Sequence, residues 1–349
     1  MASAGNPSST EKGSDGLGSE EMRLSDRGRH FLIVGGAGFI GSHFADRLLD
    51  DGDIETVVIF DNFSSGRHAH LAHRLDDPRL RVVEGDVKDI GNLIDAMTKI
   101  DVVIHLASNP DIAKAASEPQ IDFVEGTALT NNVVEAMRRT AVPRILYASG
   151  SGVYGDLGHT EAAEDHGPLI PGSTYGASKL AGEALIAAYS AMFGMTACVF
   201  RFGNVVGARQ THGVGFDFIR RLHADPSRLR ILGNGQQSKS YIHVTDVVEA
   251  VLMAHCQVNE PFRAFNVATG DYITVQEIAD LAIECLGIDR TQVVYDYTGG
   301  DRGWKGDVPI VRLNTDRIRQ LGWSNRLTTY EAMRRSLSEL QEDVRNGLA

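Results

Sequence analysis

The stretch His30-Phe31-Leu32-Ile33-Val34-Gly35-Gly36-Ala37-Gly38-Phe39-Ile40-Gly41 decides the fold of this chain. Its first five residues predict a short buried strand. Glycines follow with the spacing G-x-x-G-x-x-G, and a helical pattern then runs through Leu49. The first glycine allows a tight turn, the second lets the backbone approach a pyrophosphate, and the third lets the helix pack on the strand. The stretch predicts a dinucleotide-binding loop, although a glycine fingerprint that stands alone often marks only a turn.

Asp61 ends the next predicted strand, Thr56–Phe60, and falls 20 residues after Gly41. A carboxylate at this place accepts hydrogen bonds from both hydroxyls of an adenine ribose and repels a 2′-phosphate. The alternative is that Asp61 only caps a turn or a helix. The complete series of strand, glycines, helix, second strand and terminal acid favours the dinucleotide interpretation, and it favours NAD over NADP.

Further along the chain, short apolar strands alternate with helical stretches. We predict strands at Leu80–Glu84, Val102–Leu106 and Arg144–Ala148, with helices around 92–98 and 127–139. Parallel strands joined by helices form a sheet that is covered on both faces. The predicted fold class is therefore α/β, a Rossmann-type doubly wound parallel sheet.

After Arg201 the loops lengthen, which predicts a smaller C-terminal α/β substrate-binding domain. Within it, Thr274 and Glu277 form a capping box that starts a helix running to Leu286. The predicted domain organisation has three parts: a disordered tail at 1–29, a Rossmann domain at 30–203 plus about 241–268, and the substrate-binding domain at about 204–240 plus 269–349.

Composition excludes several classes of function. The net charge of −12 argues against nonspecific nucleic-acid binding, and no apolar run approaches the length of a membrane span. Cys198, Cys256 and Cys285 are scattered, which indicates reduced thiols and a cytoplasmic protein. The histidine run H-x-H-x-x-H at 68–73 lacks the cysteine or carboxylate cluster that would complete a metal site. We therefore predict no nucleic acid, no membrane and no metal.

A second motif carries the chemistry: Ser149-Gly150-Ser151-Gly152-Val153-Tyr154-Gly155, followed by Tyr175-Gly176-Ala177-Ser178-Lys179. Tyr175 and Lys179 are four residues apart and therefore lie on one face of a helix. The lysine charge favours the tyrosinate and is predicted to lower the pKa of Tyr175, making it a general acid/base. The spacing alone is weak evidence, but the dinucleotide loop in the same chain strengthens it.

With both motifs present, the chain resembles the extended short-chain dehydrogenase/reductase superfamily. Within it, the chain is most similar to the NAD-dependent nucleotide-sugar epimerase/dehydratase family, of the UDP-glucose 4-epimerase type. The resemblance covers residues from about 30 to 340. It is carried by Gly35–Gly41, Asp61–Gly66, Gly85–Val87, His105–Ser108, Val153–Gly155, Tyr175–Lys179, Arg201–Asn204, Tyr241–Asp246, Gly300–Arg302 and Gly306–Pro309.

The resemblance implies a role for each matched position. Tyr175 would be the acid/base, and Lys179 would bind the nicotinamide ribose and tune Tyr175. The remaining contacts to NAD would come from Gly35, Gly38, Phe39, Ile40, Asp61, Asn62, Ser64, Ser65, Gly66, Asp86, Val87, Leu106, Ala107 and Ser108. A nucleotide-diphosphate sugar would contact Asn204, and its diphosphate would face two cations, Lys239 and Arg302.

The chain departs from the superfamily just before Val153. Sugar 4,6-dehydratases resemble one another in carrying Thr-Asp-Glu there, and UDP-glucuronate decarboxylases carry Thr-Ser-Glu, whereas this chain has Gly150-Ser151-Gly152. Dehydration then has no acid/base pair, and the remaining residues suit hydride removal at C4 and its return to the opposite face. Because epimerases usually place a hydroxyl where Gly150 stands, we predict that Ser151 supplies it, with Ser149 second. The alternative is that both serines satisfy backbone groups at the strand end.

Two further departures affect single cofactor contacts. Phe123 stands where the family often has an asparagine, and Pro110 stands where a lysine is common. Neither changes the predicted class of enzyme.

The resulting prediction is an isomerase, an NAD-dependent nucleotide-sugar 4-epimerase that acts on a UDP-hexose. The substrate could instead be UDP-glucuronate, for which Arg209 is a candidate carboxylate partner, or a UDP-N-acetylhexosamine. A sugar-nucleotide dehydratase or decarboxylase and a non-catalytic NAD-binding protein are less favoured. The resemblance also implies a homodimer, formed through helices near Thr127–Arg139 and Ser178–Phe193.

Overall fold

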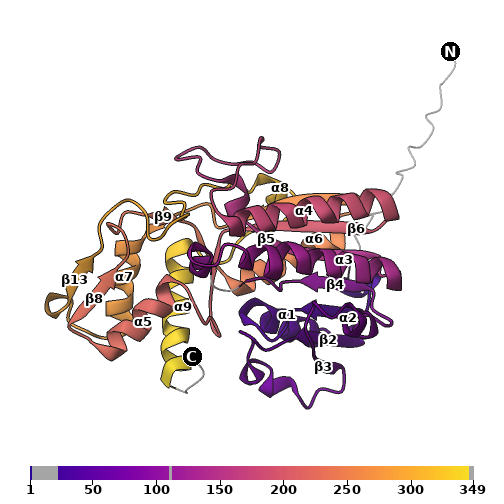
Figure 1. The fold of residues 1–349 in the computed structure, drawn as a ribbon, viewed down its shortest axis with the longest axis horizontal. Coiled ribbons are helices and arrows are strands. Elements are labelled where there is room, and N and C mark those ends of the chain that lie inside the picture. Colours follow the sequence, from indigo (N-terminus) through magenta and orange to yellow (C-terminus); the bar gives the residue numbers. More distant parts are fainter. Residues whose placement is uncertain (2–22, 110–111, 346–349) are drawn as a thin grey trace.

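The computed structural model describes Met1, residues 23–109 and residues 112–345, and a parallel sheet lies at its centre (Figure 1). The strands run in the order β11-β6-β5-β4-β1-β2-β3, and each pairs with its neighbours in parallel. They are β1 (His30–Val34), β2 (Thr56–Asp61), β3 (Leu80–Glu84), β4 (Val102–His105), β5 (Arg144–Gly150), β6 (Thr196–Phe202) and β11 (Phe262–Val267). The prediction of a Rossmann-type parallel sheet is confirmed.

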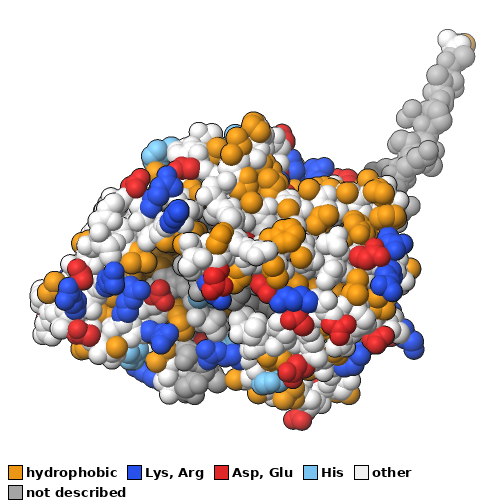
Figure 2. Space-filling view, in the orientation of Figure 1, with side chains coloured by type: hydrophobic (Ala, Val, Ile, Leu, Met, Phe, Trp, Pro, Cys, Tyr) orange, Lys and Arg blue, Asp and Glu red, His pale blue; other side chains and the backbone are white. Residues whose placement is uncertain are grey.

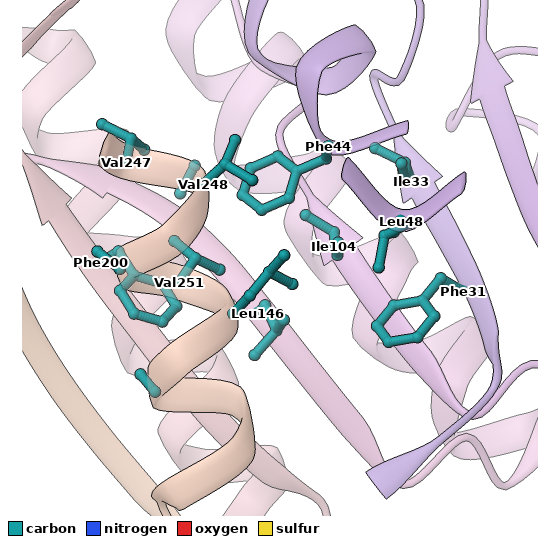
Figure 3. Close-up of a cluster of buried hydrophobic side chains, with 14 of the residues drawn as sticks. Phe31, Ile33, Phe44, Leu48, Ile104, Leu146, Phe200, Val247, Val248 and Val251 are labelled. Carbon is teal, nitrogen blue, oxygen red and sulfur yellow. The ribbon is translucent and has the colours of Figure 1, made fainter. Parts of the chain in front are cut away.

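Both faces of the sheet are buried because successive strand residues point to opposite sides. In β1, Phe31 and Ile33 join one hydrophobic cluster, whereas Leu32 and Val34 join another. The first cluster includes side chains from α1 (Phe39–Leu49) and α6 (Val244–Gln257), as Figure 3 shows. The second includes side chains from three helices: α2 (Ile90–Ala96), α3 (Leu129–Thr140) and α4 (Thr174–Phe193).

A smaller part of the molecule lies beside the sheet and has its own core (Figure 1). Here β8 (Arg228–Ile231) pairs in parallel with β13 (Val294–Tyr297). They pack with α5 (Val214–Ala224), α7 (Val275–Cys285) and α9 (Thr329–Arg345). The predicted capping box is present, because Thr274 accepts from the Glu277 amide and the Glu277 side chain accepts from the Thr274 amide. The division into two domains stays a prediction.

Short elements complete the fold and connect its two parts. They are the parallel pair β7 (Asn204–Val206) and β10 (Tyr241–His243), the antiparallel pair β9 (Ser238–Lys239) and β12 (Ile273–Thr274), α8 (Asp316–Arg319), the π-helix η5 (Phe123–Ala128), and the 3-10 helices η1 (Leu24–Arg27), η2 (His68–His70), η3 (Ala72–Arg74), η4 (Ile112–Ala116), η6 (Ser151–Tyr154) and η7 (Arg290–Gln292).

The predicted disordered tail is only partly described. Residues 2–22 lie outside the described residues. Leu24–Arg27 fall inside the predicted tail but are folded as η1, because Leu24 is 6% exposed and packs in the α1–α6 core. Arg27 also donates to the Val258 carbonyl at 2.7 Å. The tail boundary at residue 29 is therefore too late. Among the described residues, no helix has the length and apolar character to cross a bilayer.

Candidate active site

A cleft of about 1000 Å³ lies where the carboxyl ends of the sheet strands face the smaller part of the molecule. Figure 2 shows this face of the molecule hollowed between the two parts. Most of the predicted site residues line the cleft: Gly35, Gly38, Phe39, Ile40, Asp61, Asn62, Ser64, Ser65, Asp86, Val87, Leu106, Ala107, Ser108, Ser149, Ser151, Tyr175, Lys179, Asn204 and Lys239. Two predicted residues, Gly66 and Arg302, are absent from this lining.

In the loop between β1 and α1, three glycines differ in what an added side chain would contact. Gly35 adopts φ +82°, which a side chain disfavours, and a Cβ there would lie 2.8 Å from the Ala107 amide nitrogen. A Cβ on Gly41 would lie 2.5 Å from the Gly35 carbonyl oxygen, so the helix packs directly on the turn. A Cβ on Gly38, in contrast, would meet protein only at 3.3 Å. Gly38 is also the N-cap of α1, where anions bind favourably.

Asp61 ends β2 with its carboxylate held by two backbone amides. Oδ2 accepts from the Ala37 amide at 2.9 Å, and Oδ1 accepts from the Phe63 amide at 2.8 Å. The pKa of Asp61 is raised by burial, which these bonds partly offset. Asp61 is thus a turn cap and also part of the cleft wall, and its contact with an adenine ribose stays a prediction. A carboxylate has further acceptor sites, which two ribose hydroxyls would use.

The loop after Asp61 is shaped by short polar contacts. Asn62 donates to Asp86 at 3.3 Å and accepts from the Ser64 amide at 3.0 Å. Gly66 lies behind this loop, where a Cβ would approach Asp61 Oδ1 to 2.8 Å. Gly66 therefore allows the loop to close on Asp61, and the structure does not place it along the cleft.

Tyr175 and Lys179 lie one turn apart near the start of α4. Lys179 is 3% exposed, and its ammonium donates to the Ala148 carbonyl at 2.9 Å and lies 5.6 Å from the centre of the Tyr175 ring. Burial raises the pKa of Tyr175 to about 12, and it lowers the pKa of Lys179 to about 8. The predicted lowering of the Tyr175 pKa is wrong, because desolvation of the tyrosinate dominates and raises this pKa.

The serines at the end of β5 have different surroundings. Ser149 donates to Glu183 at 2.6 Å, and Glu183 forms a buried ion pair with Arg201 at 2.7 Å. Ser149 thus belongs to a structural network. Ser151 begins η6 and lines the cleft. Gly150 is extended at φ −159°, and a Cβ there would meet nothing within 4 Å.

Two of the predicted substrate residues, Asn204 and Lys239, line the cleft, whereas Arg302 lies outside this lining. Lys239 forms an ion pair with Asp307 at 2.6 Å, and Asn204 donates to the Ser240 carbonyl at 3.3 Å. Arg302 pairs with Asp156 at 2.7 Å. Both predicted cations therefore have carboxylate partners within the protein.

Several residues that line the cleft were not among the predicted site residues, and Arg221 and Trp304 are two of them. Arg221 on α5 lines the cleft, and only its spacing of four from Asp217 marks it in the sequence. Trp304, close in sequence to Arg302, also lines the cleft.

Arg209 does not face the cleft. Its guanidinium pairs with Asp46 on α1 at 2.7 Å, and its amide donates to Asp343 on α9. It joins the two parts of the molecule, so its role as a carboxylate partner for a sugar is not supported. Phe123 is largely exposed at the start of η5, and Pro110 lies outside the described residues. Within the described ranges, no group of three or more histidines, cysteines and acids is arranged to hold a metal.

Known proteins share both the sequence pattern and the fold of this chain. The model of the NAD dependent epimerase/dehydratase family matches residues 31–268. The UDP-glucose 4-epimerase of Mycolicibacterium smegmatis is 30% identical over 314 residues, covering 88% of this chain and 96% of that protein. A crystal structure of a UDP-galactose 4-epimerase superposes with a TM-score of 0.80 at 35% identity, covering 90% and 99% of the two chains. The NAD-bound dTDP-glucose 4,6-dehydratase of Streptomyces venezuelae superposes with a TM-score of 0.82 at 25% identity, covering 90% and 97%.

Proposed function

This chain belongs to the NAD-dependent epimerase/dehydratase family and uses NAD, and we propose that it is a UDP-hexose 4-epimerase. One observation carries the choice of reaction. Tyr175 and Lys179 face the cleft, but the adjoining end of β5 presents Gly150, Ser151 and Gly152 rather than carboxylates. Elimination of water from the sugar needs a further acid/base pair, whereas epimerisation at C4 needs one group that takes and returns a proton.

The residues of the cleft fit the cofactor. The backbone at Gly38, the N-cap of α1, would accept a pyrophosphate, and Asp61 would offer acceptor sites to the adenine ribose. Bound NAD would accept a hydride from C4 of the sugar and return it to the opposite face.

Tyr175 has the role of proton carrier in this scheme. It takes the proton of the C4 hydroxyl when that carbon is oxidised and returns it when the carbon is reduced. Tyr175 is half-buried in the cleft wall, and the nearby Lys179 charge would favour the tyrosinate once a substrate oxygen shares its proton. Ser151, which faces the cleft, is positioned to hydrogen-bond the sugar.

Lys239 and Asn204 support a nucleotide-diphosphate sugar as the substrate. Lys239 is the cation along the cleft that the family pattern assigns to the diphosphate, and a diphosphate would compete with Asp307 for it. Because Arg209 is paired with Asp46, we favour a neutral hexose over a glucuronate.

The test is a panel of UDP-sugars incubated with the purified protein and NAD, with the products identified by NMR. We expect interconversion of UDP-glucose and UDP-galactose with no net NADH. Inversion of only UDP-glucuronate or a UDP-N-acetylhexosamine would correct the substrate. Accumulation of a 4-keto-6-deoxy sugar, or NADH in stoichiometric amounts, would refute the proposed reaction.

We also propose a homodimer in the cytoplasm. The outer face of α4 exposes Ala177, Ala184, Ala188 and Met192, and apolar side chains gather on the surface over this helix (Figure 2). A helix that is apolar on all sides is normally buried against other protein, and we propose that a second copy of this chain buries the outer face of α4. Ala184→Glu should give a monomeric mass by light scattering if the wild type is a dimer, and a monomeric wild type would refute the dimer.

The proposed cytoplasmic location is supported by the three cysteines, which are free, as is usual in a reducing compartment.

A further inference from the structure

The ammonium of Lys179 is a positive charge held in the wall of the cleft with little access to water. Lys179 is 3% exposed and lines the cleft. An ammonium has three N–H donors, and one of them donates to the Ala148 carbonyl at 2.9 Å. Burial of a charge is costly unless the surrounding groups stabilise it. The groups packed around this ammonium therefore decide where the charge can lie.

Two tyrosine rings lie beside this ammonium. Its Nζ is 5.3 Å from the centre of the Tyr147 ring and 5.6 Å from the centre of the Tyr175 ring. The face of an aromatic ring attracts a cation within about 6 Å, and the attraction is strongest where water is excluded. Tyr175 is the proposed proton carrier, whereas Tyr147 is 2% exposed and has no part in the proposed reaction.

Tyr147 and the carbonyl acceptor of Lys179 come from consecutive residues of β5. The Tyr147 side chain packs on the sheet face that α2, α3 and α4 cover, and Ala148 follows it directly. One strand thus supplies both a carbonyl and a ring face to the same ammonium. Tyr147 is absent from the lining of the cleft, whereas Lys179 belongs to it. The ring can therefore act on a bound ligand only through Lys179.

The neighbours of Tyr147 fix the position of its ring. Gly182 follows Lys179 by three residues and so lies on the same face of α4. A Cβ on Gly182 would lie 2.8 Å from Cζ of Tyr147, so this unfavourable helix residue makes room for the ring. The ring of His105 on β4 lies 5.4 Å from that of Tyr147, and its Nε2 is 3.1 Å from the Thr130 hydroxyl.

We propose that Tyr147 is a positioning residue for Lys179, and that its ring face holds the buried ammonium beside Tyr175. This assignment rests on the proposed function, in which Lys179 binds the nicotinamide ribose of NAD and favours the tyrosinate, and it deepens that function. Both roles depend on where the charge lies. Loss of the ring should therefore weaken NAD binding and slow the proton transfer.

The first experiment observes Lys179 directly and needs no turnover. Lysine labelled with 13C at Cε is incorporated into the protein, and Lys179→Met assigns the resonance. A ring that packs over a group shifts the resonance of that group through its ring current. We expect Tyr147→Phe to keep most of this shift, because it keeps the ring. Tyr147→Leu should move the resonance towards the position of an ordinary lysine.

The second experiment changes the charge distribution of the ring and leaves its shape nearly constant. Position 147 carries phenylalanine, 3,5-difluorophenylalanine or pentafluorophenylalanine, since each added fluorine weakens the negative face of the ring. NAD affinity by calorimetry and kcat for UDP-hexose epimerisation should both fall stepwise along this series. The total fall should reach up to about thirtyfold, the size expected for a desolvated contact between a cation and a ring.

Phe31→Leu is the matched control for the loss of a buried ring. Phe31 is fully buried near the amino end of β1, in the hydrophobic cluster on the opposite face of the sheet (Figure 3). The melting temperature should fall in Phe31→Leu as it does in Tyr147→Leu. The Lys179 resonance and the NAD affinity should stay at their wild-type values in Phe31→Leu alone.

Two outcomes would overturn the assignment and leave Tyr147 as a packing residue. One is a Lys179 resonance that does not move in Tyr147→Leu, and the other is equal NAD affinity throughout the fluorinated series. If Tyr147→Leu does not fold, the fluorinated series decides, because it keeps the size of the ring. If the wild type epimerises no sugar, the proposed function fails, whereas the resonance and the NAD affinity still test Tyr147.

Discussion

The two sides of the cleft are built in different ways. On the cofactor side, side chains are fixed by packing and by backbone groups: two amides hold Asp61, and the Ala148 carbonyl holds the buried Lys179. The two cations that the resemblance assigns to a diphosphate are held by acids of the protein, Lys239 by Asp307 and Arg302 by Asp156. We therefore expect the cofactor side to bind without rearrangement, whereas a diphosphate would have to replace these ion pairs with its own.

The net charge of −12 makes the few cations of the second side important for binding an anionic ligand. An anionic sugar nucleotide is repelled by the molecule as a whole, and it gains affinity only from a few focused cations. Because Lys239 already has a partner, its net contribution to binding is the difference between two ion pairs. We expect this side of the cleft to be sensitive to salt and the cofactor side to be much less so.

The largest effect is expected from Tyr175→Phe, which removes the proton carrier and leaves the cofactor side otherwise intact. Epimerisation should fall by about 10²–10⁴-fold, the usual contribution of general acid/base catalysis. NAD affinity, measured by calorimetry, should stay within a few-fold of wild type. An active Tyr175→Phe would leave the chain as a non-catalytic NAD-binding protein or would move the chemistry to another residue.

Lys239→Met tests the opposite side of the cleft. Loss of its charge-assisted bond to the diphosphate should weaken UDP-sugar binding roughly ten- to hundredfold, with kcat much less affected. The dependence of KM on salt should also become shallower, because one cation has been removed. Arg228→Met, which removes an exposed cation paired with Asp296, is the matched control and should leave KM unchanged. Equal KM values for Lys239→Met and wild type would remove Lys239 from the site.

Within the glycine loop, Gly41→Ala and Gly38→Ala separate packing from cofactor binding. Gly41→Ala forces a contact with the Gly35 carbonyl and should cost about 1–3 kcal/mol of stability, as overpacking usually does. Gly38→Ala meets a single tight contact, 3.3 Å from the Gly35 carbonyl oxygen, so the melting temperature should fall less than in Gly41→Ala while NAD affinity falls. Thermal unfolding with and without NAD measures both effects. A Gly38→Ala variant with normal NAD affinity would contradict the cradle that we assign to this loop.

Lys179→Met should stabilise the protein near pH 7 while it abolishes function. The pKa of Lys179 is lowered to about 8 from 10.5, so the unfolded chain binds this proton more tightly than the folded protein does. Below about pH 8 this costs at most about 3 kcal/mol, and the cost disappears as the pH rises towards 10.5. Because the Ala148 carbonyl loses its donor, we expect a net gain of about 1–2 kcal/mol. Denaturation from pH 7 to 10 should show the advantage shrinking, and a constant difference would contradict the buried charge.

The smallest effect is expected from Gly150→Ser. The backbone is extended and a Cβ meets nothing within 4 Å, so stability should change by less than about 0.5 kcal/mol. If Ser151 already supplies the hydroxyl that the reaction needs, the added hydroxyl should change kcat by less than about threefold, which is about 0.7 kcal/mol in the barrier. A large gain in kcat would show that the relay of the wild type lacks a hydroxyl.

The features that could be predicted from the sequence are those formed by residues close together along the chain. β1, its glycine turn and α1 are contiguous, and the reason for Gly41 is a contact with Gly35, so a local pattern contained the geometry. The position of Asp61 beside the glycine turn could be predicted because the end of the second strand lies next to that turn in every fold of this type.

Partners that are distant in sequence could not be predicted in the same way. Nothing near Arg209 indicates that it pairs with Asp46, 163 residues away. Likewise, Ser149 gives no sign of its bond to Glu183, which follows 34 residues later. The pKa of Tyr175 was predicted in the wrong direction because burial, which dominates it, depends on the whole fold.

The chain passes between the sheet and the smaller part at several neighbouring places. β6 leads directly into β7, β10 returns into α6, and β7 and β10 are paired. A single connecting segment would act as a free hinge, but paired segments resist bending. We therefore expect the aperture of the cleft to be nearly constant and ligand exchange to depend on the glycine-rich segment 299–306. Distance measurements between spin labels on α2 and α7 should give one narrow distribution with and without UDP, and a second, wider separation would show that the paired crossings bend.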